Sequence, residues 1–124
     1  MNELDHASLE ASKRLVEVGI ILKTEFCWAP PVFGNTEKYV HRCFGYLPSL
    51  DCIPCPLFTE VWKELPDHWN WKSRTLDLLI TKESGYTVFH YSDLARNHTL
   101  FRSDDINPTD AAIGLLIWTK SNKP

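Results

Sequence analysis

The sequence predicts an α+β fold, in which an antiparallel sheet of about five strands packs against three helices within a single domain, residues 1–124. Two observations support this prediction. Apolar residues recur at every third or fourth position in three segments, as in amphipathic helices, and at every second position in the segments between them. With 124 residues, 44% of them hydrophobic, the chain is long enough for one core and too short for two. The expected order of elements is α-β-β-α-β-β-β-α.

The first third of the chain begins with a helix predicted over residues 5–18, which Gly19 ends by adopting a left-handed conformation. The residues expected on the buried side of this helix are Ala7, Ala11, Leu15 and Val18. Residues 20–28 are then predicted to form a strand, and the alternation over residues 39–46 predicts its hairpin partner. Three prolines and two cysteines make residues 47–56 an irregular connection.

A second helix is predicted over residues 57–65, because apolar residues recur there at helical spacing and Pro66 prevents continuation. Trp62 lies on its apolar stripe and is expected in the core. The helix is short and has one apolar side.

The next segment predicts a β-meander. Residues 74–82 and 86–91 alternate on either side of Ser84-Gly85, a two-residue turn signal that is typical of hairpins. Residues 98–103 are expected to add a third strand.

The C-terminal helix has a well-specified start. Asn107 is a good N-cap, Pro108 suits the first helical position, and Asp110 places negative charge in the first turn. One side of the helix carries Ala112, Leu115, Leu116 and Thr119, and Trp118 widens the stripe toward the core. This breadth predicts packing against a sheet face.

Residues 58–66 (FTEVWKELP) and 107–118 (NPTDAAIGLLIW) together resemble a group of small proteins of bacterial phages, prophages and other mobile elements. In that group a helix ending in Leu-Pro is followed by a meander and by a capped Asn-Pro-x-Asp-Ala helix. The chain departs from the group at Leu57, where a Thr N-cap is usual, and in its cysteines. The resemblance implies the fold and the genomic setting, and it carries no activity, because members of the group generally lack an assigned one.

The bulk properties narrow the classes of partner. The formal charge of −3 comes from interspersed acids and bases, so non-specific binding to nucleic acid is not expected. No apolar run approaches the roughly 20 residues that span a bilayer, and the N-terminal residues do not resemble a signal peptide. A cytoplasmic location is therefore expected, and there the four cysteines are expected to be thiols or metal ligands more often than disulfides.

Cys52 and Cys55 are spaced to bind one tetrahedral zinc ion, with Cys27, Cys43 or His41 completing the shell of a structural site. Pro56 stands where zinc knuckles usually have glycine, and the other ligands are not paired in sequence. No cofactor is therefore assigned, and zinc stays an alternative. A redox role for the pair is disfavoured, because no helix begins at the first cysteine to stabilise a thiolate.

No sequence motif identifies a catalytic site. His41, His68, His90 and His98 are candidate bases and Asp67, Asp77 and Asp93 candidate orienting groups, but no nucleophile lies on a recognised motif. An enzyme would need at least two of His41, His90, Asp77 and Asp93 to converge. The scattered glycines do not form a phosphate-binding loop.

Two large rings, Trp69 and Trp71, stand two residues apart in a polar segment predicted to be a loop, and in an extended loop they would point the same way. They either stack on a partner or fold back over the second helix and extend the core.

Three functions are therefore considered. The first is an accessory protein that acts by contacting another protein through its surface, with Trp69, Trp71, Tyr91 and Arg96 as candidate contacts. The second is a zinc-stabilised binding module, and the third is an enzyme of unrecognised type. The first is preferred because no catalytic motif is present, and the oligomeric state is left open.

Overall fold

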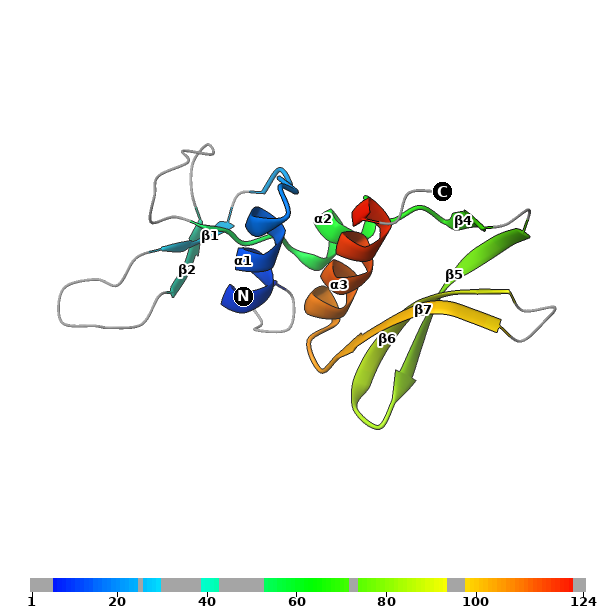
Figure 1. Ribbon diagram of the computed structural model, residues 1–124. Helices are drawn as coiled ribbons and strands as arrows, with labels where there is room; N and C mark the ends of the chain where they lie inside the picture. Colours follow the sequence, from blue (N-terminus) through cyan, green and yellow to red (C-terminus); the bar gives the residue numbers. More distant parts are fainter. Residues whose placement is uncertain are drawn as a thin grey trace.

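A computed structural model describes residues 6–24, 26–29, 39–42, 53–71, 74–93 and 98–121. The helices in these residues are α1 (Leu9–Glu17), α2 (Phe58–Trp62) and α3 (Pro108–Ser121). The strands are β1 (Phe26–Ala29), β2 (Tyr39–Arg42), β3 (Ile53–Pro54), β4 (His68–Trp71), β5 (Arg74–Glu83), β6 (Tyr86–Asp93) and β7 (His98–Asp105). Helix α3 stands in the middle, with the larger sheet on one side and α1 and the smaller sheet on the other (Figure 1).

The strands form two antiparallel sheets, which confirms the predicted α+β class. The smaller sheet has the order β2-β1-β3 and the larger one the order β4-β5-β6-β7. The predicted hairpin between the first two strands is present, with Cys27 opposite His41. The larger sheet is the predicted meander with one strand added at its edge.

Strand β4 corrects the prediction of a loop around Trp69 and Trp71. His68 and Asn70 alternate with the two tryptophans, and this period of two suits a strand with one polar side. The polar residues suggested a loop because only one side of the strand is buried. Trp69 pairs with Leu76 of β5, so its ring is directed to the core.

Helix α1 is shorter than predicted. Ser8 is its N-cap and accepts a hydrogen bond from the Ala11 N–H at 3.1 Å, so the helix begins at Leu9. Gly19 follows with φ of 79°, as predicted. The predicted burial is confirmed for Ala7, Ala11 and Leu15, but it is wrong for Val18, which is 49% exposed. Residues 20–24 do not form the start of a strand.

The hairpin between β5 and β6 turns at Ser84 and Gly85, which have φ of 50° and 86°. Positive φ at both central residues suits the right-handed twist of the flanking strands. The prediction from Ser84-Gly85 is confirmed. The third strand of the meander, β7, continues two residues past the predicted end.

Helix α3 begins as predicted, because Asn107 Oδ1 accepts a hydrogen bond from the Thr109 N–H at 2.9 Å. Its predicted inner side is buried, with Ala112, Leu115, Leu116 and Thr119 all at or below 5% exposure. The helix packs on β6 and β7 and also contacts α1 and α2. It is therefore the centre of the core.

Helix α2 ends at Trp62, three residues before the predicted end. Glu60 accepts a hydrogen bond from the Leu57 N–H at 2.8 Å, which stabilises the first turn without a polar N-cap side chain. Val61 and Leu65 are buried, but Trp62 keeps 37% of its surface exposed. The prediction of a core position for Trp62 is thus wrong, because α2 lies at the margin of the core and covers only one side of this ring.

Candidate functional site

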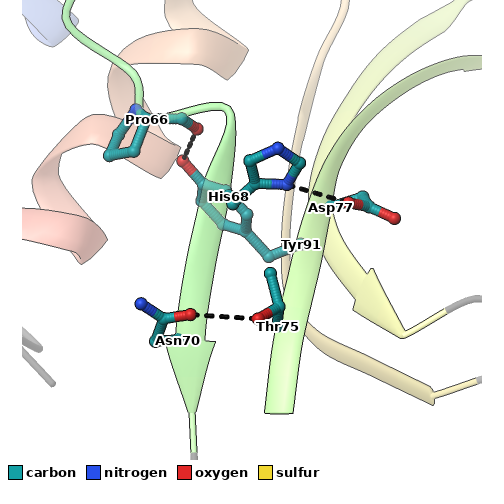
Figure 2. Close-up of polar contacts among 6 residues, drawn as sticks. All are labelled: Pro66, His68, Asn70, Thr75, Asp77 and Tyr91. Carbon is teal, nitrogen blue, oxygen red and sulfur yellow. Dashed lines mark hydrogen bonds and ion pairs between the residues drawn. The ribbon is translucent and has the colours of Figure 1, made fainter.

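The aromatic residues proposed as partner contacts lie largely in the core. Trp69 is only 6% exposed, and its ring centroid lies 5.8 Å from that of Tyr91 and 5.3 Å from that of Trp118. Tyr91 is fully buried and donates its hydroxyl hydrogen to the Pro66 carbonyl oxygen at 2.7 Å (Figure 2). Neither ring is available for stacking on a partner, because the core already covers both faces. The side chain of Trp71 and all of Arg96 lie outside the described residues.

The two described cysteines differ in whether they form a disulfide. Cys27 is disulfide-bonded, whereas Cys55 is a free and buried thiol. Cys43 and Cys52 lie outside the described residues. The expectation of a thiol is therefore wrong at Cys27. That expectation depended on the compartment alone.

Cys55 is unsuited to nucleophilic attack in this fold. Burial raises the pKa of its thiol to about 12, so the thiol stays protonated near neutral pH. The Sγ atom donates to the Ala7 carbonyl oxygen at 3.4 Å and lies 3.4 Å from His6 Nδ1. In the part of the chain that the structure describes, no group of three or more His, Cys, Asp or Glu side chains is placed to hold a metal ion. The zinc hypothesis thus loses Cys27 as a thiolate ligand.

The larger sheet has a polar face on the side away from α3. On it, His68 Nδ1 lies 2.9 Å from Asp77 Oδ1, and Asn70 Oδ1 accepts a hydrogen bond from the Thr75 hydroxyl at 3.1 Å (Figure 2). Both pairs are register partners in β4 and β5. Because both pairs are exposed to water, each contributes little to stability.

Farther along the same face, a chain of hydroxyl groups holds the His90 ring. His90 Nδ1 lies 2.6 Å from Ser92 Oγ, which in turn lies 3.0 Å from Thr99 Oγ1. Burial and the nearby Arg102 guanidinium lower the pKa of His90, so the imidazole is neutral near pH 7. Ser92 is itself buried, so its hydroxyl positions the ring and is not open to a substrate.

The convergence that an enzyme would need is not formed by the described side chains. Asp77 bonds to His68, and His90 bonds to Ser92, so the two candidate groups face other partners. Asp93 lies on the opposite face of the sheet, 3.7 Å from Arg74 Nη1. His41 belongs to the smaller sheet, and its side chain lies outside the described residues. The polar face therefore orients histidines without assembling an acid–base pair.

A different surface combines large exposed apolar side chains. Val16, Val18 and Ile21 expose 51%, 49% and 73% of their surface at the C-terminal end of α1 and just beyond Gly19. We call these three residues the apolar ridge. Isolated exposed apolar residues are ordinary, but these three border two hollows that share Ile21 as a lining residue.

Two hollows flank the apolar ridge. The smaller, of about 110 Å³, lies between α1 and β3 and is mainly apolar; Leu15, Val16, Ile20, Ile21, Leu22 and Pro54 line most of it. The larger, of about 350 Å³, lies toward α2 and α3; its lining includes Val18, Ile21, Leu116, Glu64 and Lys120. Ile21 borders both hollows, so it stands at the centre of this surface.

Sequence reasoning missed the apolar ridge because it assigned these residues to buried elements. Helical spacing predicts Val18 on the buried stripe of the first helix, and the apolar run after Gly19 predicts Ile21 in a strand. One signal was present: Val16 follows Leu15 on α1, among charged neighbours that face water. An apolar residue among the charged residues of an amphipathic helix marks a position that the helical stripe itself does not bury.

Comparisons of the chain with protein-family models, curated proteins and solved structures find no match. Within the described ranges, none of the helices has the length and apolar character needed to cross a membrane.

Proposed function

We propose that this protein binds another protein through the apolar ridge, and that it serves a phage or mobile element as an accessory protein. The exposure of Val16, Val18 and Ile21 around two hollows that share Ile21 supports this proposal most directly. The genomic setting is inferred from the resemblance of the two helical segments, and the contact surface from the geometry.

Burial of the ridge would contribute part of the free energy of binding. Complete burial of one Val or Ile side chain contributes roughly 1.5–3 kcal/mol. Because the three side chains are already partly buried, covering what remains exposed contributes roughly 3–5 kcal/mol in total. Contacts around the ridge must therefore supply the rest of the binding free energy. The described part of the chain offers no comparable set of convergent catalytic groups.

The smaller hollow indicates the chemistry of the partner. Its volume of about 110 Å³ and its apolar lining suit one aliphatic side chain, since apolar cavities of roughly 150 Å³ hold a small hydrocarbon. Glu64 and Lys120 border the larger hollow and supply charges at the rim. We therefore expect a partner that places an aliphatic anchor beside Ile21 and polar groups around it.

The test compares affinity capture from a bacterial lysate by the wild-type chain and by two single variants. Ile21→Asp places a charge at the centre of the ridge. Ile106→Asp is the matched control, because Ile106 is also exposed, at 59%, and is not among the residues that line either hollow. Both variants are first shown to melt within a few degrees of the wild type.

The proposal predicts a protein that is retained by the wild type and by Ile106→Asp and lost with Ile21→Asp. It is rejected if every captured protein binds all three chains alike. It is also rejected if the ridge mediates only self-association, which sedimentation of the purified wild type and Ile21→Asp would reveal.

A further inference from the structure

Among the described strands, β5 has no partner on its β4 side beyond residue 78. Strand β4 pairs with residues 74–77 of β5, and the Leu78 N–H donates to the Asp67 carbonyl oxygen at 3.0 Å. From residue 79 to residue 83, β5 pairs only with β6 among the described strands. The hairpin of β5 and β6 also extends away from α3 at this end (Figure 1).

The alternation of an antiparallel ladder identifies the unpaired groups. Leu78 directs its N–H toward the β4 side, so every second residue after it does the same. Ile80 and Lys82 therefore present their N–H and C=O groups to the free edge, whereas Thr81 directs its own to β6. The two N–H and two C=O groups of these residues can form hydrogen bonds with the backbone of an added strand.

The side chains beside this edge are apolar on the face that α2 covers. Ile80 is 44% exposed and is the register partner of Phe89. The Trp62 ring lies 6.1 Å from the Phe89 ring and is itself partly exposed. A strand added at this edge would thus cover Ile80 and Trp62 while it pairs with the backbone.

We propose that the occupant of this edge is β5 of a second copy, paired antiparallel about a two-fold axis at Thr81. In this register the backbone N–H and C=O of Ile80 pair with those of Lys82 in the second copy. By symmetry, the backbone groups of Lys82 pair with those of Ile80 in the second copy. All four outward groups on each chain are satisfied. The two larger sheets become one continuous sheet, with α2 and α3 of both copies on the same face.

Neighbouring registers are excluded by contacts already present. An axis at Lys82 places two ammonium groups directly opposite each other, which is unfavourable. An axis at Ile80 requires the outward N–H of Leu78, which Asp67 already uses. With the axis at Thr81, each Lys82 lies opposite Ile80, so its aliphatic stem packs near Trp62 and no like charges face each other.

Cysteine cross-linking tests this register. Thr81 and Thr75 are exposed threonines on the same face of β5, and only Thr81 lies on the proposed axis. Two residues 81 would form a directly opposed pair, in which side chains approach closely enough for a disulfide. Under mild oxidation, Thr81→Cys is expected to give a covalent dimer on a non-reducing gel. Thr75→Cys and the wild type are expected to run as monomers on this denaturing gel, because their dimers are not covalently linked.

Sedimentation velocity over a concentration series gives the second measurement. Ile80→Lys places a charge on the inner side of the edge and is expected to weaken dimerisation at least about tenfold, whereas Ile106→Lys leaves it unchanged. A wild type that is monomeric throughout the series overturns the proposal. Equal cross-linking of residues 75 and 81, or a dimer that Ile80→Lys leaves intact, overturns it as well.

Discussion

Asp110, in the first turn of α3, accepts a hydrogen bond from the backbone N–H of Ser8, the N-cap of α1, at 2.8 Å. One carboxylate thus joins the N-termini of two helices that are 102 residues apart in the chain. It complements the partial positive charge at both helix starts. Asp110 was chosen from the sequence as a charge for its own helix, and the structure adds its contact with α1.

The pH dependence of stability tests this link. Burial raises the pKa of Asp110 above its ordinary value, because the charged form is poorly solvated. An acid with a raised pKa in the folded state destabilises the fold as the pH rises from the unfolded-state value of about 3.9 through the folded-state value. Asp110→Asn removes this contribution and keeps an oxygen that can accept the Ser8 N–H.

Denaturant titrations of the wild type and Asp110→Asn from pH 3 to pH 7 measure this effect. The stability of Asp110→Asn relative to the wild type is expected to rise across the acid range. A difference that falls with pH would show that the fold favours the ionised carboxylate.

Gly114 fits α3 against β7, and we expect Gly114→Ala to destabilise the protein. A Cβ at this position would overlap Ser103 Oγ and lie 3.2 Å from Ser103 Cβ. Alanine normally stabilises a helix interior by roughly 0.5–1 kcal/mol relative to glycine, but overpacking here is expected to cost about 1–3 kcal/mol. Urea unfolding of Gly114→Ala, Ser103→Gly and the double variant gives the coupling between the sites. Additive effects would rule out the proposed clash.

The local start and turn signals were sufficient to predict most elements. Asn107 and Pro108 predicted the start of α3, Gly19 the end of α1, and Ser84-Gly85 the hairpin, because each signal depends on backbone conformation at one or two residues. The sequence did not distinguish buried from exposed positions for apolar residues near the margin of the core. Val18 and Trp62 are exposed because their neighbours in space, not in sequence, leave one side uncovered.

The candidate site was less predictable than the fold. Trp69 was considered as a surface contact or as part of the core, and only the packing of β4 against Tyr91 and Trp118 decides between these. The apolar ridge arises from the end of α1 and the segment after it, where periodicity suggested burial.

Trp69→Ala is expected to lower the free energy of unfolding by about 3–5 kcal/mol, as for other buried tryptophans. Asn70→Ala is the control on the exposed side of the same strand, with an expected change within about 0.5 kcal/mol. Chemical denaturation of both variants measures the difference. A small effect at Trp69 would restore it as an exposed contact.

Cys55 is expected to resist alkylation in the folded protein. Burial and a pKa raised to about 12 leave almost no thiolate at pH 8. Mass spectrometry after iodoacetamide treatment should find Cys55 unmodified in the native protein and modified in denaturant. Rapid labelling under native conditions would show that the thiol is accessible and can act as a nucleophile.

The affinity of the captured and purified partner for three forms of this chain tests the proposed contact most directly. Isothermal titration calorimetry is expected to show binding to the wild type and to Ile106→Asp with equal Kd, and at least about tenfold weaker binding to Ile21→Asp. Equal affinity for all three forms, with folding of each confirmed, would contradict a function carried by the apolar ridge.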